Sequence, residues 1–224
     1  AGAIHRVGAT PVFVDIEPHT FNLDPAKVGA AITEKTRAIV PVHLFGQCAN
    51  MKALNEVACG SHDREVVVIE DAAQAIGAEA AVHDVTASRG VRRTGAIGIC
   101  STISFFPAKN LGAFGDGGAV TTDSADLADK IRQMRNHGQS EQYFHHAVGG
   151  NFRLDALQAA ILRAKLPALD GWVAGRQRNA QIYRQRLTEL GIASEDLASD
   201  APIILPAERQ PRHVYNQFTI RVRG

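Results

Sequence analysis

The sequence predicts an α/β protein whose central sheet is mainly parallel. Short apolar segments alternate with helix-like segments through the first half of the chain, an order typical of this class. Residues 66–69 are almost purely β-branched, as expected for a strand buried on both faces. Glu70 and Asp71 follow this strand directly. Because ligands bind beyond the carboxyl ends of strands in such sheets, Asp71 lies where a site is expected.

Two strands and two capped helices are expected in the first 60 residues. They are strands at 11–16 and 38–44, a helix from Asp24 to about Thr33, and a helix from Asn50 to about Cys59. The pair Asp24-Pro25 is typical of a helix start, because proline fits the first helical position. Pro41 cannot donate a ladder hydrogen bond, so its strand is expected at an edge or a bulge.

The later elements are expected to include strands, helices and polar loops. Residues 79–94 contain Arg89, Arg92 and Arg93 and predict a solvated hairpin or loop, with a phosphate site as a minority alternative. Strands are expected at 96–106, 119–122 and 215–222, with a helix from Ser124 to about Asn136 and a polar loop at 139–150. A long helix is expected from Asp155, which Pro167 and Gly171 interrupt and which resumes over 173–190. A polar connection then leads to about Arg212.

Composition excludes several classes of protein. The chain has 24 Lys and Arg against 23 Asp and Glu, a balance that gives no sign of nucleic-acid binding. Cys48, Cys59 and Cys100 are too few and too scattered for a disulfide framework, and they fit a reducing, cytoplasmic compartment. No apolar run reaches membrane-spanning length and no signal peptide is seen. The sequence contains no Walker loop, dinucleotide fingerprint, nucleophile elbow or metal-ligand spacing.

The stretch from Ser104 to Val120 is the most unusual in the chain. It places Lys109 between two aromatic residues and a run with four glycines in seven positions. Such a run lets the backbone approach a ligand closely. A lysine beside apolar surface can become a nucleophile that forms an imine. The alternative is a surface turn with a solvated lysine.

Asp71 and Lys109 together suit pyridoxal phosphate (PLP). The lysine would hold the cofactor aldehyde as an imine, and the carboxylate would keep the pyridine nitrogen protonated so that the ring accepts electrons. Ser104 is available for the cofactor phosphate. A strand-end aspartate alone is more often a helix cap, so the pair in this order carries the hypothesis.

Segments spread over the whole chain resemble the DegT/DnrJ/EryC1/StrS family of PLP-dependent sugar aminotransferases, of fold type I. They are residues 8–15, 41–47, 68–78, 104–120, 135–138 and 150–162. The resemblance implies a three-layer α/β/α large domain over 1–165. It also implies, over 166–224, a connecting helix and the beginning of a small C-terminal α+β domain. Family members begin well upstream of Ala1 and continue beyond Gly224, so we expect weak cofactor retention by this chain alone.

The resemblance also implies roles for single residues. Lys109 would be the imine-forming lysine and proton carrier, and Asp71 the partner of the pyridine nitrogen. Gln74 would pack near the ring and Ser104 would contact the phosphate, while Asn151 would reach the cofactor of a neighbouring subunit in a homodimer. Candidate substrate contacts, each equally well a satisfied or surface residue, are His43, Arg153 and His213. No metal is expected.

The function expected from this resemblance is transfer of an amino group from an amino acid such as glutamate to a nucleotide-linked keto-sugar. Such a step belongs to amino-sugar, polysaccharide or antibiotic biosynthesis. One alternative is a non-catalytic remnant or regulatory module that keeps the PLP fold. A weaker alternative is a PLP-dependent sugar dehydratase, against which Lys109 argues because that branch of the family carries histidine there.

Overall fold

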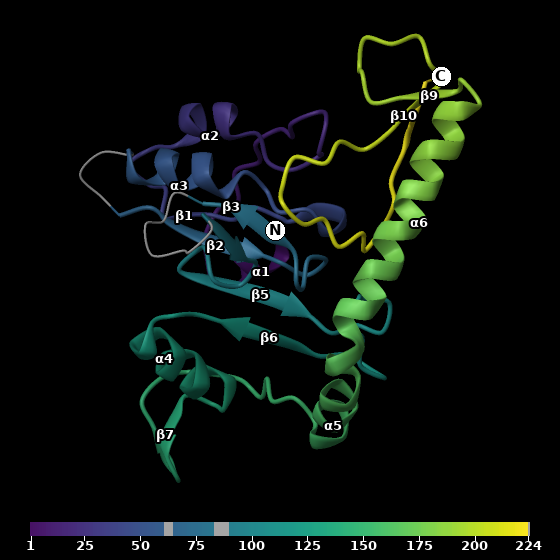
Figure 1. The fold of residues 1–224 in the computed structure, drawn as a ribbon. Coiled ribbons are helices and arrows are strands. Elements are labelled where there is room, and N and C mark those ends of the chain that lie inside the picture. The colour runs from purple at the N-terminus through teal and green to yellow at the C-terminus, as the bar shows by residue number, and fades with distance from the viewer. Residues whose placement is uncertain (61–64, 83–89, 224) are drawn as a thin grey trace.

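The computed structural model describes residues 1–60, 65–82 and 90–223, and its centre is a four-stranded sheet (Figure 1). The strands lie in the order β1 (Ala38–Ile39), β2 (Val67–Asp71), β5 (Cys100–Ser104) and β6 (Gly118–Thr121). β1, β2 and β5 are parallel, and β6 runs antiparallel to β5. The predicted class, an α/β fold with a mainly parallel sheet, is therefore confirmed. Pro41 follows β1 at the edge of the sheet, as the sequence predicts.

Three helices of the first 136 residues begin at the caps that the sequence predicts. They are α2 (Pro25–Ala31), α3 (Met51–Cys59) and α4 (Ala125–Arg135). The side chains of Asp24, Asn50 and Ser124 each accept a backbone N–H of the first turn, which satisfies a group that the helix itself cannot pair. A short helix, α1 (Gly2–Arg6), precedes them.

Two apolar clusters form the core. One packs α2 and α3 against β1 and β2 through residues such as Val28, Leu54 and Val68. The other joins the turn after β2 to the segment after Lys109 and to the later helices, through Ala75, Leu111 and Val173 among others. The second cluster includes residues of the segments after β2 and after Lys109, which carry predicted site residues. Packing of the later helices against this cluster therefore also holds these two segments in place.

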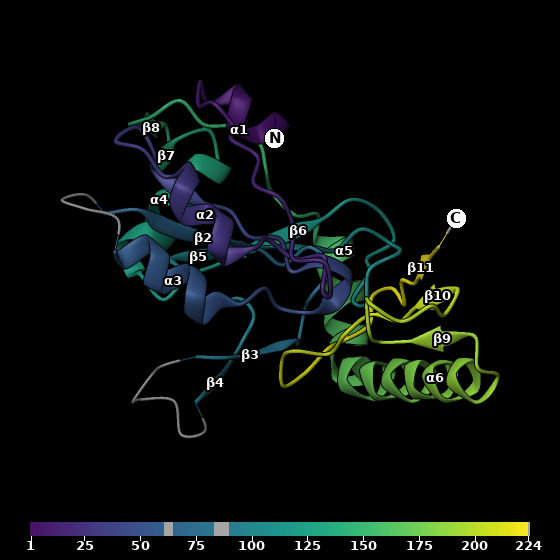
Figure 2. The same cartoon turned by 90° about the horizontal axis from the view of Figure 1, so that it is seen from above.

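The later helices and a second sheet lie to one side of the central sheet in both views (Figures 1 and 2). These elements are α5 (Ala156–Lys165), η2 (Leu166–Ala168), α6 (Leu169–Glu189), β9 (Ala193–Ser194), β10 (Ile203–Ile204) and β11 (Arg221–Val222). Pro167 lies in η2, where the two helices meet, as predicted. The predicted interruption at Gly171 is wrong, because this glycine lies inside the continuous α6. Among the described residues, no helix is both long and apolar enough to cross a membrane.

Three strand or loop predictions differ from the structure. Within the described ranges, residues 11–16 form one bridge, Ile16 with Leu23, and Val12 and Phe13 are exposed rather than packed. The predicted loop at 139–150 contains a hairpin of β7 (Gln139–Glu141) and β8 (Phe144–His145). Of the predicted strand 215–222 only β11 forms, because side-chain donors of Arg176 occupy the carbonyls of residues 215 and 216.

The predicted hairpin or loop at 79–94 is a hairpin where the structure describes it. β3 (Glu79–Ala81) pairs antiparallel with β4 (Val91–Arg93). Arg92 and Arg93 lie on β4, whereas Arg89 lies outside the described residues. Arg93 forms an ion pair with Glu79, at 3.5 Å between Nε and Oε1.

The carboxylate of Glu70, in β2, is fully buried and connects three parts of the sheet. It accepts the backbone N–H groups of Gly95, Ile97 and Gly98 at 2.8–3.0 Å. His43 Nδ1 accepts the N–H of Ala49, so its Nε2 carries the ring hydrogen and donates to Glu70 at 3.0 Å. Burial by itself would raise the pKa of Glu70, but these hydrogen bonds outweigh it and hold the pKa below its ordinary 4.5.

We predict that Glu70→Gln lowers the free energy of unfolding by about 3 kcal/mol, because an amide cannot accept at both ends. A carboxylate with a lowered pKa stabilises the fold fully above its ordinary pKa, and the contribution disappears as the pH falls through the folded-state value. Urea unfolding at a series of pH values measures both effects. The matched control is Glu56→Gln, at an exposed position on α3. Equal stability of the two variants would contradict this role of Glu70.

Candidate functional site

Two predicted site residues end neighbouring parallel strands. Asp71 is the last residue of β2 and Ser104 the last of β5. Asp71 lies opposite Thr102 in the register, two residues before Ser104. The structure therefore brings Asp71 and Ser104 to the same edge of the sheet, the one formed by the carboxyl ends of the parallel strands. Parallel sheets bind their ligands at this edge.

The backbone of Asp71 is held on both sides by the segment after β1. Its N–H donates to the carbonyl of Pro41 and its carbonyl accepts from the N–H of His43, both at 2.9 Å. Oδ1 of its carboxylate accepts the N–H of Ala73 at 3.1 Å. Within the described part of the chain Oδ2 has no hydrogen-bond partner, so one carboxylate oxygen remains available to a ligand.

Gln74 lies one turn after Asp71, and its amide connects three segments. Oε1 accepts the N–H of Phe45 at 2.7 Å, and Nε2 donates to Oε1 of Gln217 at 3.2 Å. Phe45 has a positive φ of 59°. Gln74 is thus fixed beside the sheet edge by partners from segments far away in the sequence.

Lys109 lies in a tight turn directly after β5. Its backbone N–H donates to the carbonyl of Phe106 at 2.9 Å, and the N–H of Ala113 donates to the carbonyl of Phe105 at 2.7 Å. The side chain of Lys109 is half-buried, and across the described residues its ammonium has no hydrogen-bond or ion-pair partner. Gly112 closes the turn, because a Cβ there would lie 2.3 Å from the carbonyl oxygen of Pro107.

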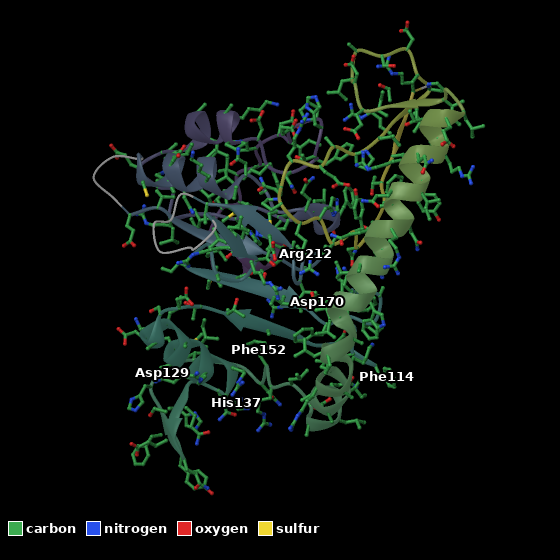
Figure 3. The ribbon with its side chains drawn as sticks, in the orientation of Figure 1. Phe114, Asp129, His137, Phe152, Asp170 and Arg212 are labelled. Carbon is green, nitrogen blue, oxygen red and sulfur yellow. The ribbon has the colours of Figure 1, made fainter. Side chains whose placement is uncertain are left out.

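The helices α5 and α6 hold the glycine-rich run in place. Gln158 Oε1 accepts the N–H of Phe114 at 2.8 Å, and Lys165 Nζ donates to the carbonyl of Gly112. The Lys165 ammonium also lies 5.8 Å from the ring centre of Phe114 and 6.0 Å from that of Trp172, within the range of cation–π attraction. Figure 3 shows Phe114 beside the junction of these helices.

Residues 213–217, which we call the strap, connect these parts, and no sequence pattern predicts this connection. The side chain of the buried Asn110, next to Lys109, donates to the carbonyl of Val214 at 2.9 Å. Val214 N–H donates to Gly46 at 2.8 Å, and Gln217 N–H to Phe45 at 3.3 Å. Gly46 has no room for a side chain beside this strap. The strap thereby ties the Lys109 turn to the segment that holds Gln74.

Asn151 and Arg153 lie apart from this edge. Asn151 forms a backbone bridge with Asn136 at the end of α4, and its Oδ1 accepts from Arg153 Nε at 3.0 Å. Both side chains are exposed. Strand register places Asp71 and Ser104 together, with Gln74 and Lys109 in the turns that follow their strands, whereas Asn151 and Arg153 lie on the segment beside the end of α4.

His43 and His213, predicted as possible substrate contacts, are both interior. The two ring nitrogens of His43 are occupied by Glu70 and Ala49. His213 accepts the N–H of Tyr215 and stacks on its ring at a centroid distance of 3.9 Å. Burial, with a smaller effect of Arg184, lowers the pKa of His213 to about 3. Their placement fits the alternative that both histidines are satisfied core residues.

The residues at the edge of the sheet fit PLP in their chemistry. Among the described residues one Asp71 oxygen and the Lys109 amine have no partner, so the carboxylate suits a protonated pyridine nitrogen and the amine suits an aldehyde. The Ser104 hydroxyl suits a phosphate. In the part of the chain that the structure describes, no cluster of three or more His, Cys, Asp or Glu could hold a metal ion.

Comparison with known proteins gives consistent matches over the whole chain. The model of the DegT/DnrJ/EryC1/StrS aminotransferase family matches residues 1–224. The chain is 49% identical over 222 residues to a "Pleiotropic regulatory protein" of Geobacillus stearothermophilus, covering 99% of this chain and 54% of that protein. It is 43% identical over 222 residues to the UDP-2-acetamido-2-deoxy-3-oxo-D-glucuronate aminotransferase of Pseudomonas aeruginosa, covering 99% and 56%.

Solved structures agree with these matches. DesV of S. venezuelae, in complex with a ketimine intermediate, superposes with a TM-score of 0.83 at 40% identity, covering 98% of this chain and 54% of that one. NtdA of Bacillus subtilis, with bound cofactor PMP, gives 0.82 at 34% identity, covering 99% and 46%. The chain spans about half the length of the relatives it matches.

We predict that Gly112→Ala lowers the free energy of unfolding by roughly 1–3 kcal/mol, because the added methyl group overpacks against Pro107. The control is Gly171→Ala. Gly171 lies inside α6 with open space around its Cα, so alanine there should stabilise the protein by roughly 0.5–1 kcal/mol. Thermal and urea unfolding measure both variants. A Gly112→Ala protein as stable as wild type would show that the turn tolerates a side chain.

Proposed function

Because the chain belongs to the DegT/DnrJ/EryC1/StrS aminotransferase family, we propose that the protein is a PLP-dependent aminotransferase of nucleotide-linked keto-sugars. An amino acid such as glutamate would supply the amino group. The observation that carries the proposal is the common edge of the sheet, where Asp71 and Ser104 end neighbouring strands and Lys109 occupies the turn that follows. The sugar-nucleotide aminotransferase from Pseudomonas aeruginosa supports the substrate class.

Each residue at this edge has a proposed task. PLP, when bound, supplies a ring that accepts electrons from the substrate carbon. The Asp71 carboxylate would keep the ring nitrogen protonated through its open oxygen, and Ser104 would donate to the phosphate. Gln74, held from both sides by Phe45 and Gln217, would pack against the ring.

Lys109 would bind the cofactor through its amine and then move protons. As an uncharged amine its Nζ would take a proton from the substrate carbon and return it at a neighbouring position, the work of a general base and acid. The tight turn and the half-buried side chain limit the positions that Nζ can reach. Such restriction favours transfer between two fixed atoms.

A second candidate function has one observation in its favour. The relative with 49% identity bears the name of a regulatory protein, which suits a regulatory module that keeps the PLP fold. Such a module has no need for an amine and a carboxylate with open positions at the same edge, so the aminotransferase remains the better-supported function. Lys109 argues against the dehydratase alternative.

We also propose a homodimer in which Asn151 serves the cofactor of the neighbouring subunit. Its exposed position, outside the group formed by Asp71, Gln74, Ser104 and Lys109, supports this role. Mixing inactive Lys109→Ala and Asn151→Ala subunits should then restore part of the activity, and no recovery after proven subunit exchange would refute sharing.

We also propose a boundary between a large domain over 1–165 and a second domain that begins at residue 166. The second domain contains α6 and the separate sheet of β9, β10 and β11, which support this division.

We predict that reduction with borohydride in the presence of PLP leaves a pyridoxyl group on the peptide that contains Lys109. Lys109→Ala should abolish both this label and amino transfer without changing the unfolding temperature, because the ammonium has no partner among the described residues. Lys130→Ala, on the exposed side of α4, is the control and should keep both. Peptide mass spectrometry locates the label, and a label on another lysine would overturn the assignment.

A further inference from the structure

A polar hollow of about 500 Å³ lies where α4 ends and β7 begins, on the part of the chain that also carries Asn151. Its walls include the arginines Arg132, Arg135 and Arg153 and the acid Asp129. Figure 3 shows Asp129, His137 and Phe152 gathered around this end of α4. The arginines come from two segments, the last turn of α4 and the residues just before α5.

Positive charge dominates the lining of the hollow. Arg132 donates to Asp129 at 2.6 Å, so one of the three guanidinium groups is neutralised. Arg153 donates from Nε to Asn151, and its two terminal nitrogens have no partner among the residues that the structure describes. Within the described residues the Arg135 guanidinium has neither a hydrogen-bond nor an ion-pair partner. Two guanidinium groups with open donors therefore face one hollow.

Arginines at the end of a helix are common because they satisfy its last carbonyl groups and its dipole. In α4 three of the last four carbonyls accept hydrogen bonds from outside the helix. Gln133 accepts from Gly138, Met134 from Gly150 and Arg135 from Phe152, at 2.8–3.0 Å. The side chains of Arg132 and Arg135 are therefore not needed to pair the end of the helix, and their position around a hollow calls for another explanation.

We propose that this hollow binds a phosphate or diphosphate group through Arg135 and Arg153. The planar guanidinium matches the paired oxygens of such anions, and Arg132 with Asp129 fixes the wall beside them. The proposal rests on the proposed function only in naming the diphosphate of a nucleotide-linked sugar as one source of the anion. Free inorganic diphosphate or phosphate carries the same chemistry.

Titration calorimetry of the purified protein without PLP tests the proposal with three probes: uridine diphosphate, inorganic diphosphate and inorganic phosphate. We expect binding of the diphosphate probes, weakened by added salt. Arg135→Gln and Arg153→Gln should each lower the affinity about tenfold or more, because each removes a charged hydrogen bond. Arg186→Gln is the control, since Arg186 is likewise exposed in the last turn of a helix, α6.

Binding that depends on Arg135 and Arg153 but not on Arg186 supports the site. Tighter binding of uridine diphosphate than of inorganic diphosphate would assign the anion to a nucleotide, and equal binding would assign it to the free anion. Absence of binding for every probe, or equal affinity in wild type and both variants, would overturn the proposal. Because no cofactor or turnover is involved, these results are independent of whether the protein transfers amino groups.

Discussion

The buried carboxylate of Glu70 is the interaction on which the sheet and its functional edge depend. It joins the middle strand to the histidine that follows β1 and to the turn that precedes β5. Burial of a charge is expensive unless its hydrogen bonds are satisfied. Here four N–H groups donate to the Glu70 carboxylate. Its burial is therefore compensated only when all three segments hold their native register. The next residue, Asp71, and the end of β5 are positioned as a consequence.

The lysine turn depends on a different set of contacts, which come from the strap and from the later helices. Asn110 donates to the strap, and the strap in turn donates to the backbone around Phe45, where Gln74 is held. From the other side Gln158 and Lys165 hold the glycine-rich run. Lys109 is thus placed by its neighbours in the turn, and its ammonium has no partner in the described part of the chain.

The sequence predicted the helix caps, the parallel strands and the residues at strand ends because these depend on local signals. Asp24, Asn50 and Ser124 each act within their own first turn. The strap and the role of Glu70 could not be predicted in this way. Their partners lie 25 to 172 residues apart in the chain, and a carboxylate followed by another carboxylate does not show which one is buried.

The same limit explains the errors over strands. Residues 11–16 are apolar enough for a short buried strand, but among the described residues no strand pairs with them beyond the bridge of Ile16 with Leu23. Residues 215–222 alternate, yet their carbonyls and N–H groups are used by Arg176 and by the segment around Phe45. Period alone does not show where backbone hydrogen bonds go. Gly171 does not interrupt α6, because the helix packs into the core through Leu169 and Val173 on either side of this glycine.

We propose that the edge of the sheet with Asp71, Ser104 and the Lys109 turn binds PLP for amino transfer. The visible absorption spectrum of the protein reconstituted with PLP tests it most directly. We expect a visible band that weakens when glutamate is added and recovers when a nucleotide-linked keto-sugar follows. A band that neither the amino donor nor the keto-sugar changes would contradict this proposal.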